Sequence, residues 1–101
     1  MTSPSFQAAD ISIIIVDFLK ADQVVKNVDF LLRQKGEEKK EILILDNSCD
    51  AENRKKLEIL QKKKEVTLLF PSENMGYSAG NNYAAKQATG KILLFLNPDI
   101  T

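Results

Sequence analysis

The sequence contains no histidine, and this absence excludes a large class of chemistry. Neither acid–base catalysis by histidine nor a histidine metal site is available to these 101 residues. Cysteine is nearly absent as well, because Cys49 stands alone and cannot form an internal disulfide. A single unpaired cysteine is typical of a reducing compartment. We therefore expect a cytoplasmic protein.

The chain also lacks an excess of charge of either sign and any long apolar run. Fourteen basic residues balance 14 acidic residues, so the overall charge does not indicate nucleic acid or an anionic membrane as a partner. No stretch approaches the roughly 20 apolar residues of a membrane-spanning helix, and residues 1–10 do not resemble a signal peptide. We expect residues 1–10 to be a disordered lead-in and residues 11–101 to form one small domain.

Short apolar runs alternate with segments of helical periodicity along this domain. The apolar runs predict strands at residues 11–16, 41–45, 66–70 and 92–96. The periodic segments predict helices at residues 22–35, 51–63 and 79–88. The order βαβαβαβ with short links and right-handed crossovers predicts an α/β fold, a three-layer sandwich around one parallel Rossmann-like sheet.

Three residues are expected to mark the helix ends. Asp22 is a plausible N-cap of the first predicted helix, and Gly36 is placed to follow its C-terminus. Asp50, with the two residues before it, is a candidate N-cap of the second helix.

The last predicted strand, residues 92–96, is an unbroken apolar run and predicts a central strand buried on both faces. Ligands of open parallel sheets bind at the carboxyl ends of the strands. Asn97 and Asp99, which follow this strand, are therefore expected where a ligand or metal would be held. Pro98 fixes the backbone between them. Asn-Pro-Asp is also ordinary turn chemistry, and the tripeptide alone does not decide between the two interpretations.

Three acids, Asp17, Asp46 and Asp99, each follow a predicted strand. In a parallel sheet these strand ends lie on one edge, so the three carboxylates are expected to converge there. One such acid usually caps a helix. Three of them on one edge, beside a glycine-containing loop, favour a functional site.

The loop of residues 73–82 leads into the third predicted helix. Its glycines, Gly76 and Gly80, allow close approach of the backbone, and the positive end of a helix suits a phosphate. The spacing matches neither G-x-G-x-x-G nor a Walker A loop, which disfavours NAD binding and P-loop chemistry. For Gly80, tight packing of the helix on the sheet is the alternative interpretation.

Together these segments resemble the N-terminal half of a family-2 glycosyltransferase of the GT-A fold. The matching segments, in the same order as in the family, are residues 12–16, 41–48, 74–82 and 90–99. The resemblance covers residues 11–101, and the ending Asn97-Pro98-Asp99 resembles members that act on deoxysugar donors such as rhamnose.

The resemblance implies the donor-binding half of an enzyme that moves a sugar from a nucleotide-diphospho-sugar to an acceptor. The acceptor of the parent enzyme would be a saccharide or a lipid-linked molecule, reached from the cytoplasm or the inner face of the membrane. A divalent cation, Mg²⁺ or Mn²⁺, would neutralise the leaving nucleotide diphosphate.

The resemblance also implies roles for individual residues. Val16 and Asp17 would line the nucleotide pocket, although Asp17 stands where the family often has an Asn/Tyr-containing turn. Asp46 would hydrogen-bond the base. The loop from Gly76 to Asn82 would flank the ribose and the diphosphate.

Within that loop the implied donor contacts are Gly76, Gly80 and Asn81. Asn97 would also contact the donor, and Asp99 matches the metal-binding acid of the family's D-x-D motif. Because Asn97 replaces the first acid of that motif, metal affinity without the donor is expected to be low.

In the family the catalytic base lies beyond the metal motif, which would place it past Thr101. We therefore expect no catalytic residue in this chain and no activity from it alone. Without the second half, we expect an apolar surface and an open strand edge, and a homodimer or larger assembly formed through residues 92–101.

Two other interpretations remain open. The first is a flavodoxin-like or receiver-type binding module, whose strand-end acids hold Mg²⁺. It requires a fifth strand and a lysine near the end of the sheet, and we expect neither within these 101 residues. The second is an interaction fragment without a ligand, whose stability no nucleotide or metal would change.

Overall fold

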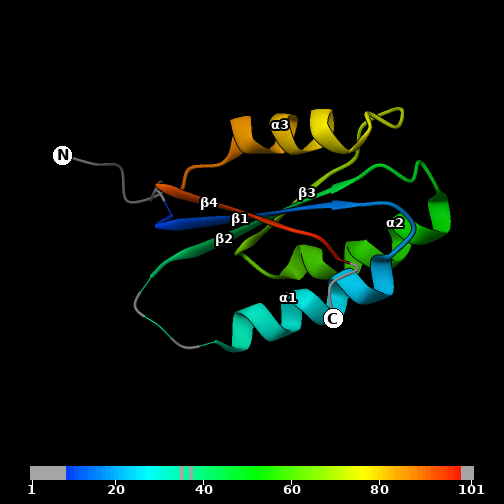
Figure 1. Ribbon diagram of the computed structural model, residues 1–101. Helices are drawn as coiled ribbons and strands as arrows, with labels where there is room; N and C mark the ends of the chain where they lie inside the picture. The colour runs from blue at the N-terminus through cyan, green and yellow to red at the C-terminus, as the bar shows by residue number, and fades with distance from the viewer. Residues whose placement is uncertain (1–8, 35, 37, 99–101) are drawn as a thin grey trace.

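The computed structural model describes residues 9–34, 36 and 38–98. The elements are, in order, β1 (Ile11–Asp17), α1 (Ala21–Arg33), β2 (Lys40–Asp46), α2 (Ala51–Glu58), the 3₁₀ helix η1 (Ile59–Lys62), β3 (Val66–Leu69), α3 (Tyr77–Gln87) and β4 (Ile92–Leu96). The strands form one parallel sheet in the order β3-β2-β1-β4. Figure 1 shows α3 on one face of the sheet and α1 and α2 on the other. The predicted three-layer α/β sandwich is confirmed.

The two faces of the sheet carry cores of different size. Successive side chains of a strand point to opposite faces, so β1 and β2 contribute to both cores. The larger core, under α1 and α2, contains Ile13, Ile15, Ala21, Val24, Val28, Ile42, Ile44, Leu57 and Leu60. The smaller core, under α3, contains Ile14, Leu43 and Ala84.

Helix α1 begins one residue before Asp22, so the expectation that Asp22 is its N-cap is wrong. The first donors of the helix are satisfied by other elements instead. Asp17 Oδ1 accepts a hydrogen bond from the Lys20 N–H at 2.9 Å, and Asn53 Oδ1 accepts one from the Ala21 N–H at 3.1 Å. A side-chain cap at Asp22 is therefore not required. The predicted cap of α2 is confirmed, because Asp50 Oδ2 accepts from the Asn53 N–H at 2.9 Å.

The C-terminus of α1 also differs from the expectation, since the helix ends at Arg33, before Gly36. The Lys40 ammonium, at the start of β2, donates to the carbonyl oxygens of Leu31 and Gln34 at 3.3 and 3.1 Å. A cation at these last carbonyls replaces a glycine cap.

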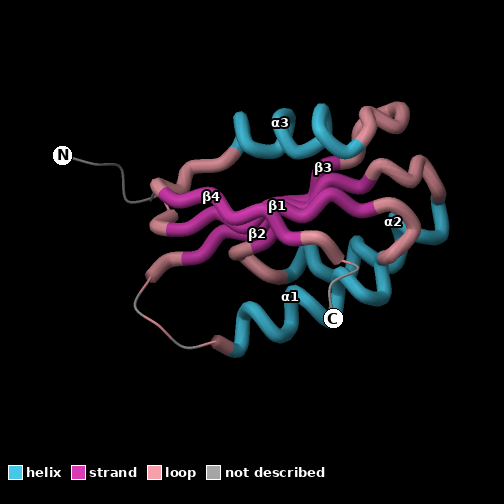
Figure 2. Tube along the Cα trace, in the orientation of Figure 1, coloured by secondary structure: helices cyan, strands magenta, loops and turns pink. Residues whose placement is uncertain are grey.

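Strand β4 lies at the edge of the sheet, so its predicted central position is wrong. Within the described residues its only strand neighbour is β1 (Figure 2). Its first four side chains are 40–56% exposed, which confirms the expected open apolar edge; they are Ile92, Leu93, Leu94 and Phe95. The apolar run predicted the strand correctly, but it did not determine how many strands pair with it.

The start of β4 is fixed by close contacts at the amino end of the sheet. The Gly90 N–H donates to Ser12 Oγ at 2.8 Å, and a Cβ atom at Gly90 would lie 2.6 Å from the Ser12 backbone nitrogen. Glu41 Oε2 accepts from Ser12 Oγ at 2.5 Å and from the Thr89 N–H at 2.8 Å. Only a glycine fits at position 90.

In the part of the chain that the structure describes, no helix has both the length and the apolar character needed to cross a membrane.

Candidate functional site

The carboxyl ends of β1, β2 and β4 border a cavity of about 360 Å³, which we call the central cavity. Its lining residues are Val16, Phe18, Lys20, Asn47, Asn74, Gly76, Tyr77, Asn97 and Pro98. Three of the predicted site residues, Val16, Gly76 and Asn97, therefore come together from separate segments. The cavity lies where ligands of open parallel sheets bind.

Asn47 shapes the central cavity and was not among the predicted site residues. Its Nδ2 donates to the Gly76 carbonyl at 2.9 Å, and its Oδ1 accepts from the Met75 N–H at 3.0 Å. The side chain is 3% exposed. The end of β2 is therefore joined to the loop that enters α3. The sequence signal was the position of Asn47 directly after Asp46 at a strand end, but its partners are 28 and 29 residues away.

The two glycines of this loop occupy different environments. Gly76 has a φ of +81°, a conformation that favours glycine, and open space surrounds its missing Cβ. Gly80 is buried, and a Cβ there would lie 3.2–3.3 Å from side-chain atoms of Asn47, Leu45 and Val16. This contact supports the packing interpretation of Gly80, whereas its donor contact stays a prediction.

Asn81 lies in the first turns of α3 and does not line the central cavity. Its Nδ2 donates to the Tyr77 carbonyl within the helix at 3.2 Å. Its contact with a donor also stays a prediction.

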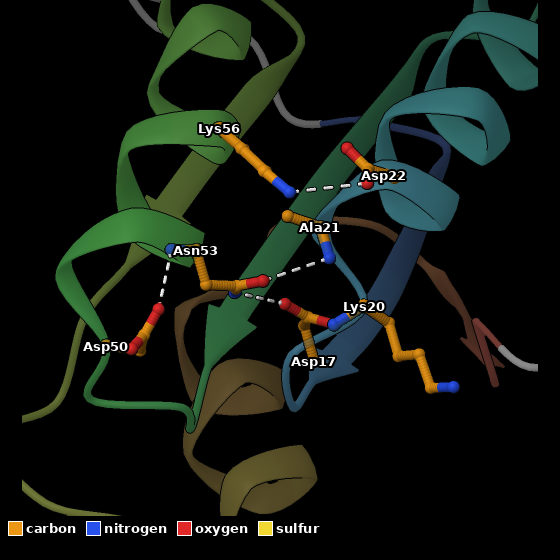
Figure 3. Close-up of polar contacts among 7 residues, drawn as sticks. All are labelled: Asp17, Lys20, Ala21, Asp22, Asp50, Asn53 and Lys56. Atoms are coloured by element: carbon orange, nitrogen blue, oxygen red, sulfur yellow. Dashed lines mark hydrogen bonds and ion pairs between the residues drawn. The ribbon is translucent and has the colours of Figure 1, made fainter.

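Asp17 and Asp46 meet at the carboxyl edge as predicted, because they are partners in the register of β1 and β2. Asn53, from α2, lies against both of them. Its Nδ2 donates to Asp17 Oδ2 at 2.8 Å and to Asp46 Oδ1 at 3.2 Å. Figure 3 shows the Asn53 amide between Asp17 and the start of α1. Asp17 is fully buried, with hydrogen bonds to both oxygens, and lies outside the lining of the central cavity.

The environment of Asp17 shifts its titration toward higher pH. Burial raises the pKa of the Asp17 carboxyl above its usual value, and the nearby Asp46 charge adds to this effect. The hydrogen bonds from Asn53 and the Lys20 N–H act in the opposite direction.

A second cavity, of about 500 Å³, lies between the ends of β2 and β3 and the start of α2. Asp46 lines it, together with Cys49, Asp50, Ala51, Arg54, Phe70, Pro71 and Ser72. The Arg54 guanidinium lies 4.2 Å from the centre of the Phe70 ring, a cation–π contact. We call this space the lateral cavity.

Asp46 is 3% exposed, and its hydrogen bonds within the described residues all reach one carboxylate oxygen, Oδ1. Its Oδ1 accepts from the Ser48 N–H at 2.9 Å as well as from Asn53. Within the described residues no hydrogen bond reaches Oδ2, which leaves this oxygen available to a ligand.

A larger hollow of about 610 Å³ lies at the opposite, amino ends of β2 and β3. Residues of both charge signs line it, among them Lys39, Glu41 and Glu65, and it contains none of the predicted site residues. The carboxyl edge therefore holds the candidate site.

The predicted metal ligand, Asp99, lies outside the described residues. In the described ranges, no three acidic or thiol side chains are grouped so that they could hold a metal ion. Asn97 is among the residues that line the central cavity. Amide and carboxylate oxygens are hard ligands of the kind that Mg²⁺ and Mn²⁺ prefer, so Asn97 and Asp99 fit such a cation.

Comparison with known proteins gave matches to one family and to several solved structures. The sequence profile of glycosyl transferase family 2 matches residues 12–101. No curated protein sequence matches the chain significantly.

The solved structures share the fold over most of the chain. Mannosyltransferase PcManGT from Pyrobaculum calidifontis, solved with GDP-Man and Mn²⁺, has a TM-score of 0.79 at 18% identity, over 92% of this chain and 28% of that one. Residues 1–349 of S. aureus TarS have a TM-score of 0.75 at 23% identity, over 89% of this chain and 27% of that one. The TarS complex with UDP gives 0.76 at 22% identity, with the same coverage. The chain thus has the GT-A fold and spans less than a third of the length of these structures.

Proposed function

The chain belongs to glycosyl transferase family 2, and on this premise we propose that it holds the nucleotide-diphospho-sugar donor of a sugar-transferring enzyme. One observation carries the proposal. The central cavity, at the carboxyl edge of the sheet, gathers Val16, Gly76 and Asn97 from three separate segments.

In this proposal the diphosphate lies against the loop before α3. Gly76, at φ +81°, exposes backbone next to the helix N-terminus, and that helix end carries a partial positive charge. Lys20 lines the same cavity and adds a full positive charge. Both features attract an anion.

The nucleobase contacts Asp46 from the side of the lateral cavity. Uracil has a ring N–H between two carbonyl groups, and guanine has a ring N–H next to one carbonyl group. Such an N–H donates well to a carboxylate oxygen. Asp46 Oδ2 is available for this bond. GDP-Man and UDP are present in complexes of the structural neighbours, which is consistent with either base.

The cation, Mg²⁺ or Mn²⁺, is held by Asp99 and by oxygens of the diphosphate, with the Asn97 amide nearby. When bound, it supplies positive charge that stabilises the leaving nucleotide diphosphate. The chain itself contributes one charged ligand here, so we expect the cation and the nucleotide to bind together.

Nucleotide binding tests the proposal directly. Thermal melting of the chain is followed with UDP or GDP, each with and without Mn²⁺. We expect the melting temperature to rise with at least one nucleotide and to rise further with Mn²⁺. Asp99→Ala removes the Mn²⁺-dependent part, whereas Asp29→Ala, on α1, keeps it. If neither nucleotide shifts melting at millimolar concentration, the proposal is wrong.

The chain by itself is proposed to bind the donor without transferring the sugar. Transfer needs a base that deprotonates the acceptor hydroxyl, and no carboxylate is among the described residues that line the central cavity. We expect no UDP or GDP release when the chain is incubated with nucleotide sugars and simple saccharides. Steady release above the uncatalysed rate contradicts this part of the proposal.

A further inference from the structure

The Asn53 amide contacts four segments at the carboxyl edge of the sheet, and Figure 3 shows two of these contacts, to Asp17 and to Ala21. Its Nδ2 reaches Asp17 at 2.8 Å on β1, Asp46 at 3.2 Å on β2 and Ser48 Oγ at 3.2 Å after β2. Its Oδ1 accepts from the Ala21 N–H at the start of α1. The side chain is 6% exposed and lines neither of the two cavities at this edge.

The surroundings of Asn53 fix the orientation of its amide. One side of the group faces a backbone N–H, which requires an acceptor, and the other faces two carboxylates, which require a donor. The inverted amide would place its oxygen against both carboxylates. A carboxylate in place of the amide would bring a third negative charge to the same point.

We propose that Asn53 is a positioning residue for nucleotide recognition, which holds Asp46 by Oδ1 so that Oδ2 stays available to the nucleobase. The inference rests on the proposed function of the chain. Asn53 also holds Asp17 away from the ligand, because both Asp17 oxygens are occupied by the Lys20 N–H and the Asn53 amide.

The charged groups around Asn53 determine how its replacement responds to pH. Asp17 and Asp46 accept hydrogen bonds from the Asn53 amide, and Asp50 accepts one from the Asn53 backbone N–H. One turn further on, the Lys56 ammonium pairs with Asp22 at 3.4 Å. The groups nearest the amide are therefore acidic, so an added carboxylate is repelled until it gains a proton.

The test compares Asn53→Asp with the wild-type chain in calorimetric titrations with UDP and GDP in the presence of Mn²⁺. At pH 8 we expect the variant to bind about tenfold more weakly, because three carboxylates then face one another. At pH 5.5 the introduced carboxyl takes up a proton, donates a hydrogen bond in place of the amide, and brings affinity to within about threefold of wild type. Gln61→Glu, an exposed site on η1 with the same charge change, serves as the matched control and keeps wild-type affinity at both pH values.

Two results overturn the role of Asn53 while leaving the proposed function intact. One is equal affinity of Asn53→Asp and wild type at both pH values. The other is a loss that does not change with pH, which would indicate a purely structural role. If wild type itself binds neither nucleotide, the proposed function fails and the role of Asn53 fails with it.

A second variant keeps the test decisive if Asn53→Asp does not fold at pH 8. Asn53→Ser cannot ionise and is too short to reach both carboxylates. We expect it to lose about fivefold in affinity at pH 8 and to recover nothing at pH 5.5. Wild-type affinity in a folded Asn53→Ser chain, checked by circular dichroism, overturns the proposal.

Discussion

Strands β2 and β4 have similar sequences and opposite environments. In β2 the apolar residues Ile42 to Leu45 are at most 1% exposed, whereas the first four residues of β4 are 40–56% exposed. Strand β2 has strand neighbours on both sides and lies in a sheet with helices over both faces, while β4 pairs with β1 alone among the described residues (Figure 1). An apolar run therefore indicates a strand that could be buried. The order in which the strands pair decides whether that strand lies in the centre of the sheet or at its edge.

The comparison extends to the residue that follows each strand end. Asn47, after β2, is buried and bonded to the loop before α3, whereas Asn97, after β4, is exposed and lines the central cavity. The same residue type thus serves packing in one place and borders a cavity in the other.

The largest expected effect is on core packing. Ile44→Ala removes a fully buried side chain from β2 and should lower the free energy of unfolding by about 2–5 kcal/mol. Leu94→Ala, on the exposed strand, should lower it by less than about 1 kcal/mol. Urea unfolding of both variants, at a low micromolar concentration where the chain is monomeric, measures the difference. Equal losses would show that β4 is covered in solution.

Self-association through β4 is the next effect in size. We expect the chain to form a homodimer or larger assembly at high micromolar concentration, because an open strand edge with apolar side chains on both faces favours pairing with a second copy. Leu94→Lys should return it to a monomer with unchanged circular dichroism. Light scattering over a concentration series measures the assembly. A folded wild-type chain that stays monomeric throughout contradicts the prediction.

The two asparagines should separate stability from binding. Asn47→Ala removes two part-buried hydrogen bonds, to the Met75 N–H and the Gly76 carbonyl, and should cost about 1–3 kcal/mol of unfolding free energy. Asn97→Ala should change stability by less than about 0.5 kcal/mol and weaken binding of UDP or GDP with Mn²⁺. Urea unfolding and calorimetry measure the two quantities. A large stability loss in Asn97→Ala would remove the contrast.

The smallest expected effect concerns Asp17 and pH. Its pKa is raised in the folded chain, so the folded state binds a proton more tightly than the unfolded state. Its contribution to stability is therefore present below the ordinary value of 3.8 and is lost as pH rises through the raised pKa. We expect the stability of wild type relative to Asp17→Asn to fall as pH increases above 3.8. Urea unfolding between pH 3 and 7 measures this, and a rise in relative stability would contradict it.

Most of the fold could be predicted from the sequence because its signals are local. The four apolar runs marked the strands to within one or two residues, and Asp50 marked the start of α2. The caps of α1 could not be predicted, since the acceptor for Ala21 is Asn53, 32 residues away.

The candidate site also contains some residues that the sequence predicted and others that it did not. Val16, Gly76 and Asn97 were predicted from strand ends and glycines, and they share one cavity. Asn47 and Asn53 were not predicted, because an asparagine that bonds to distant elements has no distinguishing pattern around it. The sequence predicted that Asp17 and Asp46 lie together, but it could not show that the Asn53 amide donates a hydrogen bond to each of them.

The contact between Gly90 and Ser12 has a consequence at the far end of the sheet. A strand advances about 3.3 Å per residue and turns its side chain to the other face at each step. If β4 started one residue later, Asn97 would move by that distance and leave the wall of the cavity for the opposite face. The missing side chain at position 90 therefore sets the place of Asn97, seven residues further along the chain. The proposed nucleotide site thus depends on a close fit at the amino edge of the sheet, where no ligand is expected.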